Sequence, residues 1–158
     1  LMIHEGAPQV VEFNCRFGDP ECQALMVGLP GDLVPALLTC ATGGLKGAET
    51  ELAALMGVDA FRPSACVVLA SEGYPGSPRT GTVIRGIADA DRLDGVQVFH
   101  AGTDLGPSGD VVAAGGRVLT VTGTGSDLSE ALDRAYAGID AIDWPEGFCR
   151  RDIGWRVR

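Results

Sequence analysis

The distribution of apolar residues predicts a strand-rich region in the second half of the chain. Ala65–Ala70 is a short, continuous apolar run, which is typical of a buried strand. Turn-forming residues separate further candidate strands, which lie at 82–86, 97–102, 110–114 and 117–123. We expect this region to fold as a small, mostly antiparallel β domain.

One long helix is predicted near the end of this region, over about 127–141. Asp127 and Glu130 stand three residues apart and resemble a capping box with the aspartate as the cap. The apolar residues that follow recur at helical spacing on one face, namely Leu128, Ala131, Leu132, Ala135, Tyr136 and Ile139. The helix is expected to end before Trp144 and Pro145.

The first 60 residues carry a different pattern, with one strand and several short helices. A hairpin turn at 4–8 is predicted to lead into a strand at Gln9–Asn14, which Gly18–Asp19–Pro20 ends. Asp19 is the expected cap of the next helix. The helices are expected at 20–27, at 33–42 after an Asp32 cap, and at 45–55. A boundary near 57–62 divides the chain into residues 1–60 and 61–158.

Three polar side chains share one face of the predicted first strand. Glu12, Asn14 and Arg16 stand at alternating positions, so they point the same way, while Phe13 and its alternating neighbours face the packing side. A carboxylate and an amide oxygen are hard ligands of the kind that Mg²⁺ prefers beside phosphates. A guanidinium can bind a phosphate oxygen bidentately. The alternative is an amphipathic edge strand with a solvated polar face.

Composition and charge limit the possible partners. The chain has 158 residues and a net charge of −9, which argues against non-specific nucleic-acid binding. The five cysteines have no metal-ligand spacing, so buried free thiols in a reducing, cytoplasmic compartment are expected. No apolar run is long enough to span a membrane. The chain starts on an apolar strand, so we expect residue 1 to lie inside a longer domain.

The run Glu-Phe-Asn-Cys-Arg-Phe-Gly-Asp-Pro-Glu at 12–21 resembles the signature of the phosphoribosylamine–glycine ligase family of ATP-grasp enzymes. Four later segments also resemble the carboxyl-terminal domain of that family, and they occur in the same order. They are Ala-Ser-Glu-Gly-Tyr-Pro-Gly at 70–76, Val-Phe-His-Ala-Gly-Thr at 98–103, Gly-Gly-Arg-Val-Leu at 115–119 and Arg-Arg-Asp-Ile-Gly at 150–154. The resemblance covers nearly the whole chain.

This resemblance implies an α/β (α+β) fold, with the C-terminal part of an ATP-grasp module followed by the small antiparallel domain. It implies ATP-dependent ligation of glycine to 5-phosphoribosylamine through glycyl phosphate, with Mg²⁺ or Mn²⁺. Glu12 and Asn14 then match the metal ligands, and Arg16 matches the catalytic arginine. The tentative substrate-binding residues are Asp19, Gly76, Arg79, His100, Gly116 and Arg117. The missing N-terminal part of the enzyme would complete the site, so the chain alone is expected to be inactive.

Two other interpretations remain open from the sequence. The Glu12–Arg16 pattern is general to ATP-grasp enzymes, so a different ligase or a carboxylase is possible, although the residues at 18–21 argue against it. The chain could also be a non-catalytic binding or assembly module. His100, Gly116 and the other loop residues have a structural alternative too, as hydrogen-bonded or turn-forming residues.

Overall fold

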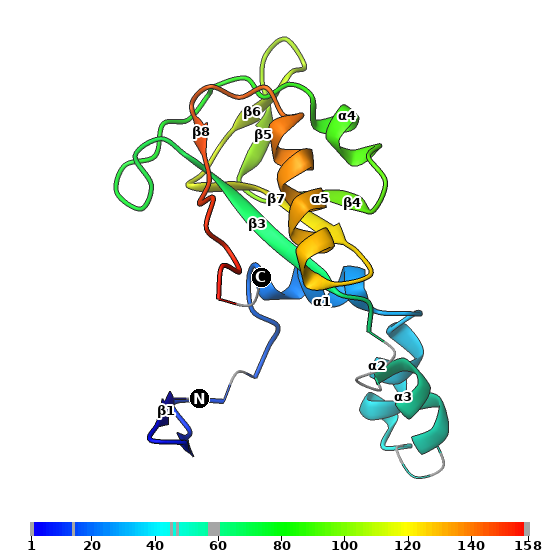
Figure 1. Ribbon diagram of the computed structural model, residues 1–158. Coiled ribbons are helices and arrows are strands. Elements are labelled where there is room, and N and C mark those ends of the chain that lie inside the picture. The colour runs from blue at the N-terminus through cyan, green and yellow to red at the C-terminus, as the bar shows by residue number, and fades with distance from the viewer. Residues whose placement is uncertain (1, 14, 45, 47, 57–60, 157–158) are drawn as a thin grey trace.

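A four-stranded antiparallel sheet carries the core of the protein (Figure 1). The computed structural model describes residues 2–13, 15–44, 46, 48–56 and 61–156, and its main sheet has the order β4-β7-β3-β8. The strands are β3 (Ser64–Ser71), β4 (Val96–His100), β7 (Arg117–Thr124) and β8 (Gly147–Phe148). The strands expected at 65–70, 97–102 and 117–123 are therefore present, and the expected mixed, mostly antiparallel fold is confirmed.

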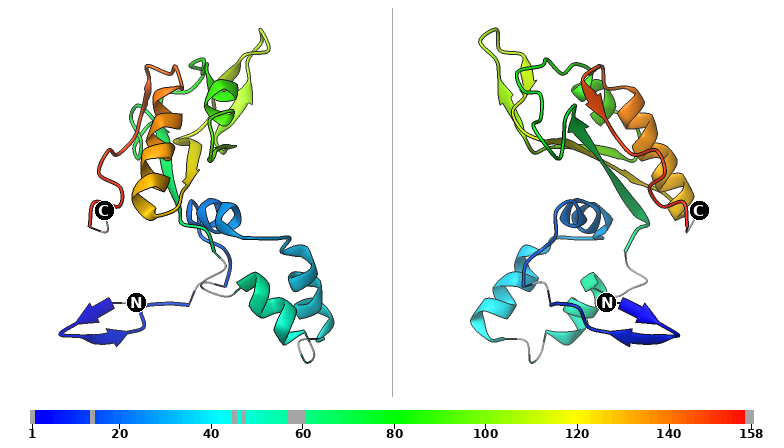
Figure 2. Two further views of the ribbon diagram at one scale, coloured as in Figure 1. Left: turned by 45° about the vertical axis from the view of Figure 1, so that its right-hand side comes forward. Right: turned by 90° about the vertical axis from the view of Figure 1, so that its left-hand side faces the viewer.

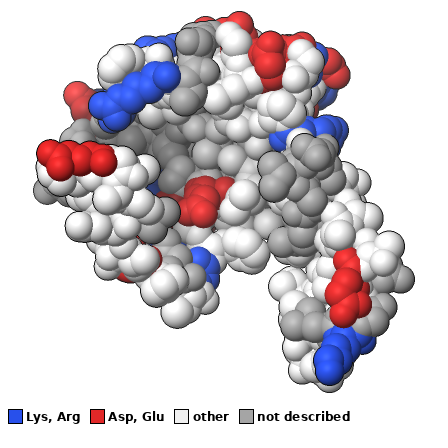
Figure 3. Space-filling view, turned by 60° about the horizontal axis from the view of Figure 1, so that its bottom comes forward, with Lys and Arg blue, Asp and Glu red and all other residues white. Residues whose placement is uncertain are grey.

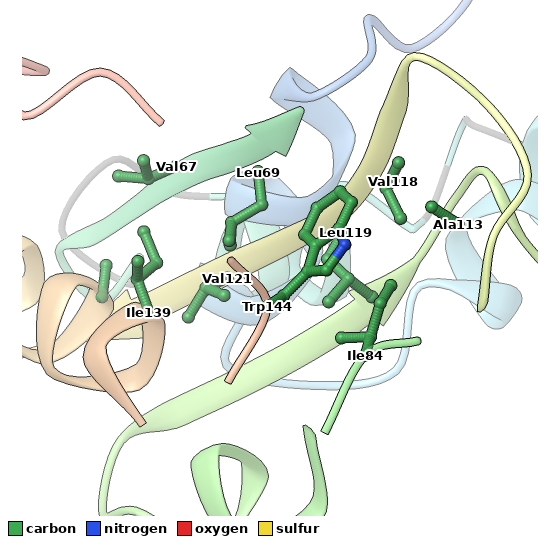
Figure 4. Close-up of a cluster of buried hydrophobic side chains, with 10 residues drawn as sticks. Val67, Leu69, Ile84, Ala113, Val118, Leu119, Val121, Ile139 and Trp144 are labelled. Atoms are coloured by element: carbon green, nitrogen blue, oxygen red, sulfur yellow. The ribbon is translucent and has the colours of Figure 1, made fainter. Parts of the chain in front are cut away.

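Helices cover both faces of the two central strands, β3 and β7. Helix α5 (Leu128–Asp140) lies on the face that carries Val67 and Val121, and Figure 4 shows Ile139 of this helix beside Val121. Side chains alternate along a strand, so Ser64 points to the opposite face. There its hydroxyl donates to the carbonyl of Ala24 at 2.8 Å, within α1 (Glu21–Gly28). β7 is buried after its first residue because it is covered from both sides.

Helix α5 begins where the sequence predicts and packs very closely on β7. Asp127 is its N-cap and accepts a hydrogen bond from the amide of Glu130 at 2.8 Å. The Glu130 carboxylate reaches back to the amide of Ser126 at 2.6 Å, one residue earlier than the usual capping box. A Cβ atom at Gly123 would lie 2.6 Å from the amide nitrogen of Ala135, so this close contact requires glycine.

Apart from α1, the first part of the chain extends away from the sheet (Figure 2). β1 (Met2–His4) and β2 (Ala7–Gln9) form a hairpin, and α2 (Val34–Thr42) and α3 (Glu49–Met56) follow α1. The predicted hairpin turn and the helices at 20–27 and 33–42 are confirmed. Asp32 accepts from the amide of Val34 at 2.9 Å, one residue before the N-cap position.

Other predictions for this part fall partly on residues that the structure does not describe. The helix expected at 45–55 is described from Glu49, while 45 and 47 lie outside the described residues. The boundary near 57–62 falls on a segment of which 57–60 are likewise not described. The division into residues 1–60 and 61–158 therefore stays a prediction.

Two predictions at the start of the chain are wrong. The strand expected over Gln9–Asn14 stops at Gln9, because Val10–Phe13 find no pairing strand among the described residues; Asn14 lies outside them. Asp19 does not cap α1, since Pro20 occupies the N-cap position and no side chain caps this helix. The Asp19 carboxylate accepts instead from the side-chain amide of Gln23 at 3.1 Å.

The region between β3 and α5 is more irregular than expected. The strand predicted at 82–86 is wrong, since this segment makes only isolated bridges, from Val83 and from Arg85. β6 (Val111–Ala113) agrees with the expected strand at 110–114 and pairs with β5 (Thr103–Leu105), which the sequence analysis missed. The sequence pattern does not predict α4 (Ile87–Asp91), because this helix is too short to show periodicity.

The cysteines follow the prediction only in part. All five are free thiols, but Cys15 and Cys40 are exposed, and Cys22, Cys66 and Cys149 are half-buried. Within the described part of the chain, no helix has both the length and the apolar character needed to cross a membrane.

Candidate functional site

The antiparallel sheet brings three of the predicted loops to one end. β3 ends at Ser71, β4 ends at His100 and β7 begins at Arg117, and in the sheet these three termini lie next to one another. We call this region the loop end of the sheet. The amide of Ser71 donates to the carbonyl of Gly116 at 2.9 Å, and the amide of Gly102 donates to that of Arg117 at 3.0 Å. These hydrogen bonds join residues 45 and 15 positions apart, so the three segments share one backbone hydrogen-bond network.

The long loop after β3 carries two of the candidate residues, Gly76 and Arg79. Arg79 pairs with Glu72 at 3.4 Å and with Glu146 at 3.7 Å, and its carbonyl accepts from the Ser71 hydroxyl. Two carboxylates therefore already neutralise this guanidinium. Gly76 is exposed in the same loop, where an added Cβ atom would lie 3.2 Å from the carbonyl oxygen of Gly73.

His100 lies exposed at the end of β4. Its Nδ1 atom is 3.0 Å from the hydroxyl of Thr103, which orients the imidazole. This contact leaves the other ring nitrogen, Nε2, as the one that a ligand could use. This arrangement suits His100 as a binding or proton-transfer group. It equally suits the alternative in which His100 is only a hydrogen-bonded structural residue.

Arg117 and Asp19 make a contact that spans 98 residues of sequence. The Nη2 atom of Arg117 lies 2.9 Å from Oδ2 of Asp19, and Nη1 donates to the Asp19 main-chain carbonyl at 3.1 Å. Both side chains are about half exposed, at 43% and 51%. The contact joins the signature segment at 12–21 to the loop end of the sheet.

The remaining predicted residues are Glu12, Asn14 and Arg16, of which the structure describes Glu12 and Arg16. Glu12 and Arg16 are exposed, and Nη1 of Arg16 donates to the carbonyl of Phe17 at 2.9 Å. Asn14 is outside the described residues. Within the described residues, no three histidine, cysteine or acidic side chains are grouped so as to hold a metal ion. Glu12 is nevertheless suited to a metal that is shared with phosphates, because Mg²⁺ commonly takes one or two carboxylates and completes its shell from the substrate.

Comparison with known proteins identifies the family. Residues 64–156 match the family described as "Phosphoribosylglycinamide synthetase, C domain", which is more than half of the chain. The chain belongs to the phosphoribosylglycinamide synthetase C-domain family. The resemblance noted in the sequence is therefore confirmed.

Individual relatives are similar in sequence to this chain over almost its whole length. A chloroplastic phosphoribosylamine–glycine ligase of Arabidopsis thaliana is 51% identical over 99% of this chain, and one of Phenylobacterium zucineum is 52% identical over the same share. The chain spans only 29% and 36% of their lengths. The crystal structure of a Thermotoga maritima phosphoribosylamine–glycine ligase covers 96% of this chain and 34% of its own, with 32% identity and a TM-score of 0.76.

On the face drawn in Figure 3, the charged side chains are scattered rather than concentrated. Figure 3 shows one face on which uncharged residues predominate and the lysines and arginines form separate small groups. Arg150 is bound to Asp152 by two contacts at 2.9 and 2.7 Å, and this hydrogen bonding lowers the pKa of the Asp152 carboxyl. The described lysines and arginines in this view form no continuous basic surface.

Two features of the structure could not be anticipated from the sequence. A hollow of about 400 Å³ lies between the end of α5 and β8, and its wall includes Trp144, Cys149 and Arg151. Burial raises the pKa of the Cys149 thiol, and Arg151 is already paired with Asp140 at 2.6 Å. The second feature is the Arg117–Asp19 contact. No periodicity or motif spacing connects two residues so far apart; only the fold does.

Proposed function

We propose that the chain acts as the C-terminal part of a phosphoribosylamine–glycine ligase of purine biosynthesis. Its substrates would be ATP, glycine and 5-phosphoribosylamine, and its products 5′-phosphoribosylglycinamide, ADP and phosphate. The observation that carries the proposal is the match of the chain, over 99% of its length, to proteins that bear this name. The upstream part of such an enzyme would supply the rest of the ATP site. The free thiols of the described structure suit a cytoplasmic location.

The proposed reaction has two steps, because a carboxylate is a poor electrophile. Glycine oxygen first attacks the γ-phosphorus of ATP, and ADP leaves, giving glycyl phosphate. The amine of 5-phosphoribosylamine then attacks the acyl carbon, inorganic phosphate leaves, and the nitrogen loses a proton. Both steps move charge between phosphate oxygens, so fixed cationic groups stabilise their transition states.

The residues of the signature segment have separate proposed roles. Glu12 and Asn14 would hold Mg²⁺ or Mn²⁺, which neutralises the charge of the nucleotide phosphates when bound. Arg16 would bind the transferring phosphoryl group or the acyl phosphate through its guanidinium. The exposure of Glu12 and Arg16 supports this, because neither side chain is committed to the interior of this chain.

The loop end of the sheet is the proposed contact region for the phosphorylated sugar. Gly76 and Gly116 would let backbone amides approach an anion, and His100 offers a ring nitrogen on the exposed side. Arg79 would contribute less charge, since Glu72 and Glu146 pair with it. Asp19 and Arg117 are considered separately below.

A chimeric enzyme tests the proposal. Residues 1–158 would replace the matching segment of the Phenylobacterium zucineum relative, with which they share 52% identity. The chimera should form ADP in the presence of both glycine and 5-phosphoribosylamine. Glu12→Gln should lower kcat at least tenfold and raise the Mg²⁺ concentration required, because one metal ligand loses its charge. Glu5→Gln, in the exposed hairpin turn, is the matched control. A chimera that folds but forms no product, or a Glu12→Gln variant with unchanged metal dependence, would refute the assignment.

A further inference from the structure

The contact between Arg117 and Asp19 differs from an ordinary surface ion pair. One guanidinium binds the side chain of Asp19 at 2.9 Å and the main-chain carbonyl of the same residue at 3.1 Å. A contact with both the carboxylate and the backbone fixes the orientation of the residue, and not only its distance. Half-exposed ion pairs contribute little to the free energy of unfolding. The main effect of the Arg117–Asp19 contact is therefore to fix the position of Asp19 relative to the sheet.

The turn that contains Asp19 is also held by neighbouring elements. From α1, the side-chain amide of Gln23 donates to Oδ1 of Asp19 at 3.1 Å. From β3, the thiol of Cys66 lies 3.2 Å from the carbonyl oxygen of Pro20. The amide of Cys22 donates to the carbonyl of Gly18 at 2.8 Å. β7 adds the contact from Arg117, which lies at the loop end of the sheet.

The main chain of Arg117 is itself held by strand pairing and hydrogen bonds. It pairs with Ala70 at the edge of the β3–β7 ladder, and its carbonyl accepts from the amide of Gly102 at 3.0 Å. The preceding residue, Gly116, accepts from the amide of Ser71 at 2.9 Å. The guanidinium thus connects a well-ordered strand end to the turn that directly follows Arg16 and Phe17.

We propose that Arg117 is a positioning residue that holds the Gly18–Pro20 turn, and through it Arg16, in place relative to the sheet. Its role in the reaction rests on the proposed function. Both of its terminal nitrogens are engaged by Asp19, so Arg117 acts through another residue instead of binding the sugar phosphate. A displacement of about 1 Å in a group that contacts the transferring phosphoryl group can lower turnover by about 100-fold.

Hydrogen exchange on the chain itself tests the positional role without any assumption about activity. Arg117→Gln should speed exchange of the non-proline amides at 18–22 about tenfold or more, above all that of Cys22, which donates to the carbonyl of Gly18. The β3 amides, such as that of Leu69, should keep their protection. Arg92→Gln is the matched control, because Arg92 makes an ordinary exposed ion pair with Asp89 at 2.6 Å. Unchanged exchange at 18–22 would overturn the proposal. Equal loss of protection in β3 would also overturn it, since Arg117 would then only stabilise the fold.

Kinetics of the chimera test the consequence for catalysis. Arg117→Lys keeps the charge but loses the planar fork whose two nitrogens contact the carboxylate and the main-chain carbonyl of Asp19. We expect kcat to fall about tenfold or more, with KM for 5-phosphoribosylamine within twofold of the parent. Asp19→Asn should add little to this loss, because both changes remove the same contact. A raised KM with unchanged kcat would instead identify Arg117 as a substrate ligand and overturn the proposal. If the unsubstituted chimera were inactive, the proposed function would fail, and the exchange experiment would still decide the positional role.

Discussion

The ring of Tyr74 lies against the α-carbon of Gly116. A Cβ atom added at position 116 would overlap Cδ2 of this ring and come within 3.1 Å of Cε2. Tyr74 belongs to the loop after β3, and Gly116 precedes β7, so the contact closes the long loop onto the loop end of the sheet. Gly116 therefore has a packing reason to be glycine, in addition to its proposed contact with an anion.

Gly116→Ala should destabilise the chain by about 1–3 kcal/mol, because the new methyl group forces the Tyr74 ring out of place. Urea unfolding measures this change. The same substitution in a Tyr74→Ala background should cost much less, since the clash is gone. Gly44→Ala is the control, because its Cβ would meet only ordinary contacts of 3.8 Å or more. An equal cost of Gly116→Ala with and without Tyr74 would show that the ring does not cause it.

Thr122 offers the opposite kind of test, a substitution that should stabilise. It is fully buried in β7, and its hydroxyl oxygen has no hydrogen-bond partner among the residues that the structure describes. Burying an unpaired hydroxyl costs roughly 1–3 kcal/mol. Thr122→Val keeps the shape and β-branching, so the midpoint of thermal unfolding should rise. Thr124→Val, at a buried residue of the same strand whose hydroxyl donates to the carbonyl of Gly95 at 3.3 Å, is the comparison. A lower midpoint for Thr122→Val would mean that the hydroxyl is satisfied.

The sequence predicted those elements whose own residues determine them. The continuous apolar run at 65–70 and the helical spacing from Leu128 to Ile139 both depend on burial within this chain, and both elements are where they were expected. The alternating segment at 9–14 looked equally regular. It is not a strand in the described residues because a strand also needs a neighbour to pair with, and alternation alone does not supply one.

The candidate site was predictable in the same limited sense. The motifs at 70–76, 98–103 and 115–119 were found as separate loops, and the antiparallel order of β4, β7 and β3 explains why they meet. The pairing of Asp19 with Arg117 depends on how α1 docks on the sheet, which no local pattern encodes. The sequence suggested Asp19 as a helix cap. Its carboxylate instead accepts a hydrogen bond from the side-chain amide of Gln23 and pairs with the guanidinium of Arg117.

Glu130 makes the stability of the chain depend on pH. Hydrogen bonds from the backbone and hydroxyl of Ser126, and then the charge of Arg134, lower the pKa of its carboxyl from the usual value. A carboxyl whose pKa is lower in the folded state adds stability above its unfolded pKa, and this stability is lost as pH falls through the folded pKa. Glu130→Gln should therefore be less stable than the parent at pH 7, and the difference should shrink on acidification. Urea unfolding from pH 7 to pH 3 measures this, with Glu5→Gln as control. A difference that stays constant over this range would contradict the assignment.

The exposed apolar residues near the start of the chain can be tested by comparing their effect on stability in the chain alone and in the chimera. Phe13 of the signature segment is 83% exposed, and Val11, just before that segment, is 66% exposed. Both stand on the alternating face for which the sequence predicts packing. If the chain works as the C-terminal part of a longer ligase, these side chains pack against the upstream part. Phe13→Ala should then leave the unfolding of the chain alone within about 0.5 kcal/mol, as for an exposed site. In the chimera the same change should cost about 3 kcal/mol, as for a buried phenylalanine. Phe148→Ala, which alters the sheet in both contexts, should have the same effect in each. If Phe13→Ala has no effect in the chimera, the upstream part does not cover this segment.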